Sequence, residues 1–351
     1  MSMLPIDRGG VRKLLLTTVP GLEDLLLEEV QRIAPGRGAL RRGRVLYELE
    51  RAAGGGELSR MLSKLTLAEK VRAVVAEGRA RELGGIRRLV LSAPALEGLG
   101  RRPLFFAVEA EREGDHSFTS VDVARVVGSA IQELYPNLRV SLDDPDVLLY
   151  AELIEDEFRL AIDLTPFISL KDRGYRVYVH PSSLNPIVAR SMVRIARLKA
   201  GETLVDPMCG SGTIVIEGLL DQPAAVGLGF DVNPRHVRGA LLNASTAGVV
   251  ADFAVADVRR LSRTLRESVD VLAANPPYGI RERPVGGLAA VYRALFRAGR
   301  ATLREGGRLV VLSPLKGLVE RASRLYGWSP ASVRQIEMGG LAAFIYLFER
   351  E

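Results

Sequence analysis

Apolar and polar positions alternate in short runs through the first half of the chain. Strand-like runs at 11–19 and 43–50 flank an amphipathic helical run at 22–33, which gives a small β-α-β pattern. A glycine-rich joint follows at 51–57. After it, the apolar spacing predicts a longer helix over residues 58–78.

A second group of short elements follows this predicted helix. Residues 104–112 alternate as a strand, and Thr119 or Ser120 stands at the N-cap position of a helical run. Residues 149–165 hold two strands that are separated by an acidic turn. Short strands with few helices predict an α+β first half.

From residue 187 onward the pattern changes to a regular alternation of strands and helices. This alternation is typical of α/β folds with a doubly wound, mostly parallel sheet. The segment 169–187 is polar and basic, so we interpret it as the connection to this last domain. The predicted strands lie at 201–209, 224–232, 251–258, 269–279, 307–314 and 342–350, and the predicted helices at 187–198, 212–221, 233–248 and 288–303.

The composition fits a protein of several packed domains. A chain of 351 residues is too long for one compact core, and 47% hydrophobic residues are ample for more than one. No apolar run reaches the roughly 18 residues of a membrane helix, and the N-terminus lacks the apolar core of a signal peptide. We therefore expect a cytoplasmic protein with no membrane association.

Cysteine and histidine usage gives no sign of a metal site. The single cysteine, Cys209, excludes an intrachain disulfide. The three histidines, His116, His180 and His236, are scattered along the sequence, so we expect no metal.

The basic residues of this chain are mostly arginine. The net charge is +6, and only six of the 48 basic residues are lysines. Guanidinium groups match the geometry of phosphates, so this excess favours a nucleic-acid partner. Codon bias or adaptation to heat explains the same composition equally well. Composition alone therefore does not distinguish a nucleic-acid partner from these two explanations.

The first strand of the last domain runs into a glycine-containing loop. Gly210 and Gly212 let the backbone approach a ligand closely, and a helix follows at once. The small residue that a dinucleotide fingerprint needs three positions later is replaced by Val215, which weakens a nicotinamide-cofactor hypothesis. Asp206 precedes the glycines, and its carboxylate suits an ammonium group better than a pyrophosphate.

The next two strands also end on acidic residues. Asp231 could accept hydrogen bonds from ribose hydroxyls, and Asp257 could accept one from an adenine amino group. Each residue also has a structural interpretation: Asp231 could cap the following helix, and Asp257 could cap the turn after its strand. Ammonium, ribose and adenine together describe S-adenosylmethionine.

The fourth strand ends in the stretch ANPPYG at 274–279. The side-chain oxygen of Asn275 and the carbonyl of Pro276 could grip the two hydrogens of an exocyclic amino group. Pro277 would hold the turn open, and Tyr278 offers a face on which a base can stack. Such placement both orients the amine and stabilises the transition state for methyl transfer. A rigid strand exit is the structural alternative.

These motifs resemble known families. DPMCGSGT at 206–213, with FDVN at 230–233, ADV at 256–258 and NPPYG at 275–279, resembles the class I amino-methyltransferases that use S-adenosylmethionine. Residues 116–131 and 144–165 resemble a THUMP domain, an RNA-binding module, and 170–176 resembles the junction in THUMP-linked RNA methyltransferases. The chain most resembles the tRNA guanine-N2-methyltransferases that modify guanosine 6 of the acceptor stem. Relatives that act on guanosine 10 usually carry an aspartate where Asn275 stands.

The resemblance implies a domain organisation and a set of cofactor contacts. It implies an N-terminal ferredoxin-like domain at 1–60, a THUMP domain at 61–166, a linker at 167–186 and a Rossmann-like methyltransferase domain at 187–351. By resemblance, Asp206, Gly210 and Gly212 line the methionine end of the cofactor, Asp231 takes the ribose and Asp257 the adenine. The further implied cofactor contacts are Asn185, Pro207, Cys209, Thr213, Val232, Val258 and Asn275, and the implied catalytic set is Asn275, Pro276, Pro277 and Tyr278.

The resemblance also implies how the RNA is held. The N-terminal half would grip the single-stranded 3′ end of tRNA while the acceptor stem lies at the active site, and no obligate protein partner is indicated. The N2 of a paired guanine lies inside the helix, so the base would have to leave the stack.

Five other functions stay open at this point. The target could be guanosine 10 of tRNA or a guanosine of rRNA, or the chain could be a non-catalytic RNA-binding protein. A DNA adenine methyltransferase is disfavoured by the THUMP resemblance, and a dehydrogenase is disfavoured by Val215.

Overall fold

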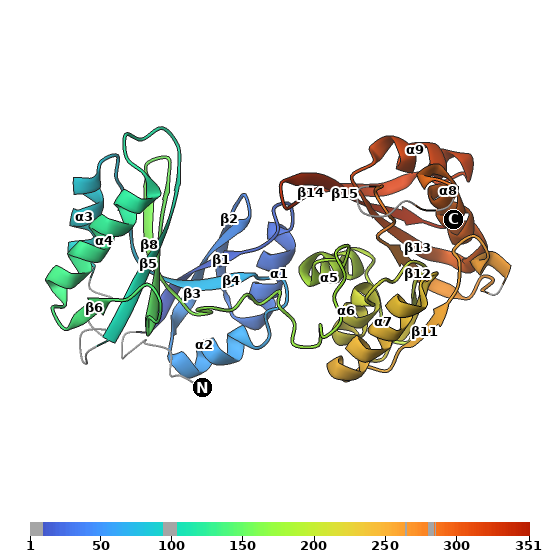
Figure 1. Cartoon of the computed structure of the whole chain (residues 1–351), viewed down its shortest axis with the longest axis horizontal. Coiled ribbons are helices and arrows are strands. Elements are labelled where there is room, and N and C mark those ends of the chain that lie inside the picture. Colours follow the sequence, from blue (N-terminus) through green and yellow to red (C-terminus); the bar gives the residue numbers. More distant parts are fainter. Residues whose placement is uncertain (1–9, 94–103, 264, 280–283, 285) are drawn as a thin grey trace. The chain divides into compact units, whose positions relative to one another are not determined.

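A computed structural model describes residues 10–93, 104–263, 265–279, 284 and 286–351, and these residues fall into two compact units (Figure 1). The first unit comprises the described part of Met1–Thr18 together with Glu23–Leu170. The second unit comprises Val19–Leu22 and Lys171–Glu351. Within the described part of the chain, no helix is long and apolar enough to cross a membrane.

The first unit is built on one eight-stranded sheet. Its strand order is β2-β3-β1-β4-β8-β7-β5-β6, and β4 pairs antiparallel with both β1 and β8, which makes the sheet continuous. The finer division of this unit at residue 60 stays a prediction. The elements are β1 (Val11–Thr17), α1 (Glu23–Ile33), β2 (Gly36–Arg41), β3 (Arg44–Ala53), α2 (Gly55–Leu62), β4 (Lys70–Arg79), α3 (Leu83–Leu91), β5 (Leu104–Glu113), α4 (Ser120–Leu134), β6 (Leu138–Val140), β7 (Val147–Ile154) and β8 (Glu157–Asp163).

The capped helix of this unit was predicted correctly. α4 begins after Thr119, whose hydroxyl oxygen accepts a hydrogen bond from the Asp122 N–H at 3.3 Å. The Asp122 carboxylate accepts in return from the Thr119 N–H at 2.9 Å. The two bonds form a reciprocal capping box that satisfies two backbone donors. The two strands around the acidic turn are also confirmed, as β7 and β8.

The single helix predicted over residues 58–78 is wrong. This segment forms the end of α2 and most of β4, with a turn between them. In the turn, the buried carboxylate of Glu29 accepts hydrogen bonds from the backbone N–H groups of Thr66, at 3.0 Å, and Leu67, at 2.9 Å. β4 then exchanges ladder bonds with β1 and β8, and these long-range bonds outweigh the local helix propensity.

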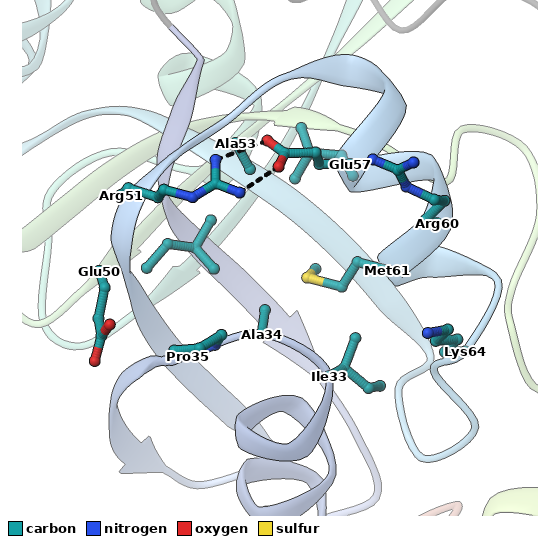
Figure 2. A pocket seen from close by; sticks show the side chains of 12 residues that line it. Ile33, Ala34, Pro35, Glu50, Arg51, Ala53, Glu57, Arg60, Met61 and Lys64 are labelled. Atoms are coloured by element: carbon teal, nitrogen blue, oxygen red, sulfur yellow. Dashed lines mark hydrogen bonds and ion pairs between the residues drawn. The ribbon is translucent and has the colours of Figure 1, made fainter.

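A cavity of about 510 Å³ opens in the first unit between the end of α1, β3 and α2 (Figure 2). Apolar side chains contribute much of its lining, and charged side chains from β3 and α2 stand around it. Arg51 and Glu57 form an ion pair at one side of it. The lining residues are Ile33, Ala34, Pro35, Leu49, Glu50, Arg51, Ala53, Glu57, Leu58, Arg60, Met61 and Lys64.

The second unit has the predicted doubly wound sheet. Its order is β11-β10-β9-β12-β13-β15-β14, and the first five strands are parallel while β15 pairs antiparallel with β13 and β14. The elements are α5 (Pro186–Ile195), β9 (Thr203–Asp206), α6 (Thr213–Asp221), β10 (Val226–Asp231), α7 (Pro234–Ala247), β11 (Asp252–Val255), η3 (Leu261–Arg263), β12 (Val269–Ala274), α8 (Leu288–Thr302), β13 (Leu303–Ser313), α9 (Lys316–Leu325), β14 (Pro330–Met338) and β15 (Leu341–Glu349). The patterning did not predict α9 or β14.

A buried apolar cluster fixes α8 and α9 against this sheet. Tyr292 and Phe296 of α8 are fully buried in it, together with Phe348 of β15. The Phe296 and Phe348 rings meet edge to face with centroids 5.1 Å apart. The indole N–H of Trp328 donates to the Phe296 carbonyl oxygen at 3.1 Å. The core therefore holds rigidly the strand that leads into ANPPYG.

Candidate active site

The register of the parallel strands brings four of the predicted site residues to one edge of the sheet. Asp206 at the end of β9 pairs with Gly229, two residues before Asp231. Asp231 pairs with Val255, two residues before Asp257. On the other side of β9, Val205 pairs with Leu272, three residues before Asn275. This carboxyl edge is where ligands bind in open α/β sheets.

The loop after β9 needs glycine at both predicted positions. Gly210 and Gly212 have φ angles of 52° and 80°, in the left-handed region. A Cβ atom at Gly212 would lie 3.0 Å from the Cβ of Ala240 and 3.1 Å from the Phe253 ring. Gly212 is also the N-cap of α6, which starts at the buried Thr213, so the loop delivers a helix N-terminus to the edge of the sheet.

Pro207 and Cys209 are buried residues of this loop. The backbone N–H of Cys209 donates to the carbonyl oxygen of Phe230 at 2.8 Å, which ties the loop to β10. Burial raises the pKa of the Cys209 thiol, and the carboxylates of Asp206 and Asp231 raise it further. The thiol is therefore neutral, and Cys209 acts as a small packing residue.

Asp206 is a buried carboxyl group with one local donor. Its Oδ1 accepts from the Met208 N–H at 3.0 Å. Burial raises its pKa to about 8, and the nearby Asp231 also acts to raise it. A cation placed beside this carboxyl group would stabilise its charged form and lower the pKa again. The site therefore suits a ligand with an ammonium group.

Asp231 connects the loop to the start of α7. Its carboxylate accepts from the N–H of Gly210 at 3.0 Å and from the N–H of Asn233 at 2.8 Å. Asn233 is itself the N-cap of α7, so the cap and the acidic residue are separate. The neighbouring Val232 is 65% exposed, at the rim of the same edge.

Asp257 carries a partner that the sequence did not indicate. The Arg259 side chain wraps its carboxylate, with Nε at 2.9 Å from Oδ1 and 2.8 Å from Oδ2. This guanidinium is the main cause that lowers the pKa of Asp257. A ligand amino group at Asp257 would therefore compete with Arg259. Val258, the next residue, points into the apolar core.

The ANPPYG stretch places two hydrogen-bond acceptors just after the end of β12. The hydroxyl of Tyr278 donates a hydrogen bond to Oδ1 of Asn275. The carbonyl oxygen of Pro276 takes no hydrogen bond from any described residue. Burial raises the pKa of Tyr278, so this hydroxyl stays neutral and remains a donor. Two acceptors thus lie side by side in the chain, and one of them already binds a hydrogen.

Two histidines that looked scattered in the sequence are stacked beside the cofactor loop. The rings of His180 and His236 lie 4.4 Å apart with an interplanar angle of 10°. His236 Nδ1 is 3.3 Å from Oδ1 of Asp231. A Cβ atom at Gly210 would lie 2.7 Å from His180 Nε2. No motif in the sequence predicted this contact, because the two residues come from the linker and from α7.

The same linker segment is fixed to α7 by Asn243. The Tyr178 N–H donates to Asn243 Oδ1 at 2.8 Å, and Asn243 Nδ2 donates to the carbonyl oxygens of Tyr178 and Ser211, both at 2.9 Å. A Cβ atom at Gly239 would lie 2.0 Å from the Tyr178 ring, so the segment packs directly on the helix backbone. Asn243 therefore joins the linker to the glycine loop.

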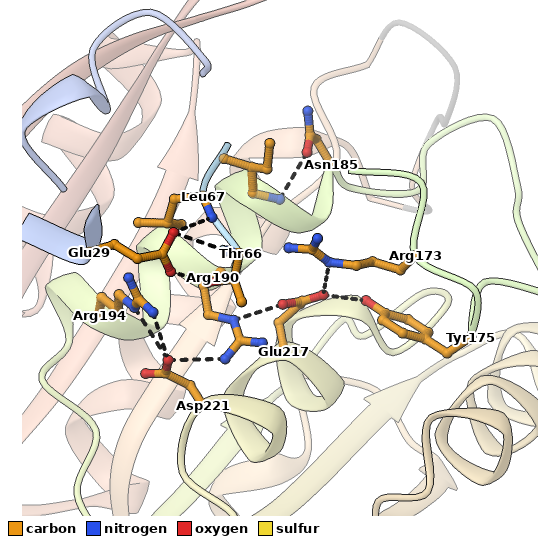
Figure 3. A network of polar contacts seen from close by, with 11 residues as sticks. Glu29, Thr66, Leu67, Arg173, Tyr175, Asn185, Arg190, Arg194, Glu217 and Asp221 are labelled. Atoms are coloured by element: carbon orange, nitrogen blue, oxygen red, sulfur yellow. Dashed lines mark hydrogen bonds and ion pairs between the residues drawn. The ribbon is translucent and has the colours of Figure 1, made fainter. Parts of the chain in front are cut away.

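A buried ionic network lies around α5 and α6 (Figure 3). The Glu217 carboxylate is fully buried and accepts from Arg173 at 3.1 Å, Tyr175 at 2.9 Å and Arg190 at 2.8 Å. Arg190 also bonds Asp221 at 3.0 Å. These bonds fix the linker and α5 to α6, the helix that follows the glycine loop.

Asn185, predicted as a cofactor contact, caps α5. Its side-chain oxygen accepts from the Ile187 N–H at 2.9 Å (Figure 3). Its amide nitrogen is left for another acceptor. Among the described residues, no group of three or more histidine, cysteine and acidic side chains is arranged to hold a metal ion.

Comparison with known families finds a match in each unit. A family described as an RMKL-like methyltransferase domain matches residues 173–343, and the THUMP domain matches residues 97–163. The second match covers every element from β5 to β8.

Two named relatives and one solved structure are similar over much of the chain. The tRNA (guanine(6)-N2)-methyltransferase of Thermus thermophilus is 36% identical over 95% of this chain and 98% of its own length. The tRNA (guanine(10)-N2)-dimethyltransferase of Methanothermobacter thermautotrophicus is 34% identical over 54% of this chain and 57% of its own length. The crystal structure of TrmN from Thermus thermophilus aligns with a TM-score of 0.83 and 34% identity, over 97% of this chain and 99% of that one.

Proposed function

Since the chain belongs to the THUMP-containing tRNA guanine-N2-methyltransferases, we propose that it methylates N2 of guanosine 6 in the acceptor stem of tRNA. The methyl donor is S-adenosylmethionine. The observation that carries the proposal is the pair of neighbouring acceptors at Asn275 and Pro276, on the same sheet edge as the buried Asp206.

These two acceptors supply what an exocyclic amine needs. The nitrogen lone pair of guanine N2 is delocalised into the ring, which makes the amine a poor nucleophile. Hydrogen bonds from its two hydrogens to Asn275 Oδ1 and the Pro276 carbonyl pull the nitrogen toward a pyramidal geometry. The lone pair is then localised and directed away from both acceptors. The same acceptors stabilise the positive charge that develops on nitrogen.

Charge and proton balance require no strong base in the pocket. The N2–carbon bond forms as the sulfur–carbon bond breaks, and the positive charge moves from sulfur to nitrogen. The nitrogen then loses one hydrogen as a proton, through the acceptors to water. Tyr278 stays neutral because burial raises its pKa, so it positions and stacks but does not take this proton.

The residues of the edge fit S-adenosylmethionine. Asp206 supplies a buried carboxyl group whose charged form an ammonium group would stabilise. The left-handed backbone of Gly210 and Gly212 lets the loop approach the ligand. Asp231 and Asp257 supply acceptors for the ribose and the adenine. The further cofactor contacts that we propose are Asn185, Pro207, Cys209, Thr213, Val232, Val258 and Asn275.

Guanosine 6 is preferred over guanosine 10 for two reasons. The relative named for position 6 matches nearly the whole chain, whereas the relative named for position 10 matches about half of it. An amide at residue 275, in place of an aspartate, agrees with this preference. The same chemistry at guanosine 10 or at an rRNA guanosine stays the alternative.

We assign the first unit to the 3′ end of tRNA. Its cavity combines an apolar lining, suited to an unpaired base, with Arg60 and Lys64, suited to a phosphate. In the described residues, neither Arg60 nor Lys64 forms an ion pair. Contacts here would offset the cost, a few kcal/mol, of extruding the target base from the stack. A protein that acts on tRNA is expected in the cytoplasm, and this location stays a prediction.

A methyl-transfer assay with three RNAs tests this proposal. Labelled methyl groups from S-adenosylmethionine should enter unmodified tRNA transcripts with guanosine at position 6, and a transcript with adenosine 6 should accept none. A tRNA without its 3′ CCA should be methylated with a lower kcat/KM. Equal labelling of the adenosine 6 transcript would reject the position, and no labelling of any tRNA would favour a non-catalytic RNA-binding protein.

A further inference from the structure

Two segments beside the active site carry arginines and no acidic residue. The turn at 258–266 and helix α8 at 288–302 both lack aspartate and glutamate. Their seven arginines are Arg259, Arg260, Arg263, Arg266, Arg293, Arg297 and Arg300.

The structure joins the two segments into one surface. A guanidinium nitrogen of Arg297 donates to the carbonyl oxygen of Arg259 at 3.0 Å. Arg293 and Arg297 are four residues apart on α8, so they stand on one face, about 6 Å apart along the axis. All three arginines are exposed. We call Arg259, Arg293 and Arg297 the α8 basic surface.

The charge of this surface is hardly neutralised within the described residues. Arg293 and Arg297 form no ion pair there, and Arg259 pairs only with Asp257. Some other arginines of the same unit are paired, as Arg190 is with Glu217 and Asp221. Exposed cations that are gathered together repel one another, and an anionic ligand would relieve this repulsion.

Arg300 does not belong to this surface. Its guanidinium lies over the Trp328 ring, 5.0 Å from the centroid, and reaches the carbonyl oxygen of Gly327. This contact gives Arg300 a packing role. Arg293 has no such contact among the described residues, and the bond of Arg297 to the Arg259 carbonyl oxygen lies within the α8 basic surface itself.

The surface is joined to the candidate site through Asp257, whose carboxylate accepts from Arg259. Arg259 comes two residues after Asp257, and its guanidinium approaches residue 286, just before the start of α8. In the described part of the chain, α8 is the first helix after ANPPYG. A nucleotide whose amine lies at Asn275 would therefore have its neighbouring phosphates within reach of these arginines.

We infer that the α8 basic surface binds the phosphate backbone of tRNA beside the target guanosine. This inference rests on the proposed function and adds to it the residues that hold the stem. Such contacts position the RNA without reading its sequence. They would hold the strand while the target base leaves the stack.

The test compares two pairs of arginines on neighbouring helices. The first variant is Arg293→Ala with Arg297→Ala. The control is Arg321→Ala with Arg324→Ala on α9, since these arginines are also exposed and also form no ion pair in the described residues. The Kd for unmodified tRNA is measured at several salt concentrations, together with S-adenosylhomocysteine binding and the thermal unfolding midpoint.

The α8 pair should weaken tRNA binding roughly tenfold at moderate salt and make log K fall less steeply with log salt, by about one unit for each contact removed. S-adenosylhomocysteine binding should not change. The control pair should leave both the affinity and the salt slope as in the unmodified enzyme.

The other possible outcomes bear either on the inference or on the proposed function. An unchanged salt slope in the α8 variant, or an equal loss in the α9 variant, overturns the inference even when the unmodified enzyme methylates tRNA normally. The single variant Arg293→Ala, which removes no contact within the fold, decides the case if the double variant unfolds. Failure of the unmodified enzyme to methylate any tRNA would instead reject the proposed function.

Discussion

The Tyr278 hydroxyl donates its hydrogen to Oδ1 of Asn275, the atom that the target amine would use. In the free enzyme this acceptor is therefore satisfied, which avoids the cost of a half-buried oxygen without a partner. Binding of the target guanine has to replace this internal bond by one from the amine. The two residues are thus joined by a side-chain hydrogen bond, which a simple strand exit does not need.

Asn275 is the first residue to vary. Asn275→Ala removes one of the two acceptors and should lower kcat about 100-fold or more, the size seen when one preorganised polar group is lost from an active site. Asn275→Asp keeps an oxygen at the same place and should lose less. Single-turnover methylation of tRNA checks this, with S-adenosylhomocysteine affinity as the control for an intact fold. Full activity of Asn275→Ala with bound cofactor would refute the pocket chemistry.

Tyr278 separates stacking from hydrogen bonding. Tyr278→Phe keeps the ring face and removes only the hydroxyl, so kcat/KM should fall by less than about tenfold. Tyr278→Ala removes the face, and a lost base–aromatic stack of about 1–3 kcal/mol corresponds to a fall of roughly 10- to 100-fold. Steady-state kinetics on tRNA measure both. If the two variants are equally impaired, Tyr278 acts through its hydroxyl and not through stacking.

Asp206 should lower the stability of the ligand-free enzyme at pH 7, compared with the variant Asp206→Asn. Its pKa rises from 3.8 to about 8 on folding, so its stability contribution is fully present below pH 4 and is lost as the pH rises toward 8. Asp206→Asn has no such loss and should raise the unfolding midpoint at pH 7, by about 2–4 °C for each kcal/mol recovered. It should also weaken S-adenosylhomocysteine binding, because the ammonium loses its carboxylate.

Proton release gives an independent check on Asp206. Ligand binding to the unmodified enzyme should release protons as the ammonium lowers the pKa of this carboxyl group. Titration calorimetry at pH 7 in two buffers with different ionisation enthalpies measures the number. Asp206→Asn should release nearly one proton fewer, and equal numbers for the two proteins would show that Asp206 is already charged.

Gly210 should not accept a side chain. Gly210→Ala places a methyl group 2.7 Å from His180 Nε2 at a φ of 52°, so the loop or the histidine has to move. S-adenosylhomocysteine affinity should fall at least about tenfold, which corresponds to about 1.4 kcal/mol. The double variant Gly210→Ala with His180→Ala should recover part of it, because only the backbone strain remains. No recovery would show that His180 does not position the loop.

Glu217 should be important for stability although it lies outside the site. Glu217→Ala leaves Arg173 and Arg190 without their buried partner, and breaking such a network costs about 3–5 kcal/mol. The exposed pair Arg197–Glu349 is the matched control, and Glu349→Ala should cost at most about 1 kcal/mol. Urea unfolding monitored in the second unit compares them. Similar losses would place Glu217 among ordinary surface ion pairs.

The sequence allowed the edge of the second sheet to be predicted because strand and helix alternate there. Such alternation imposes parallel strands whose ends meet, so the polar residues after each apolar run, from Asp206 to Asn275, had to gather. The left-handed φ of Gly210 and Gly212 likewise agreed with the expected close backbone approach.

What could not be predicted depends on residues that are distant in sequence. The predicted helix over residues 58–78 took in most of β4, because the strand partners of β4, β1 and β8, lie far away along the chain. The stacking of His180 on His236 depends on how the linker packs on α7. The bond between Arg259 and Asp257 joins close neighbours, but a side-chain conformation carries no sequence signal.

The most direct test of the central claim is to locate the methyl group. The enzyme is incubated with S-adenosylmethionine and an unmodified tRNA transcript that has guanosine at positions 6 and 10, and the digested RNA is mapped by mass spectrometry. We expect N2-methylguanosine at position 6 with the unmodified enzyme, and little or none with Asn275→Ala. A methyl group on another atom, or on position 10 alone, would contradict it.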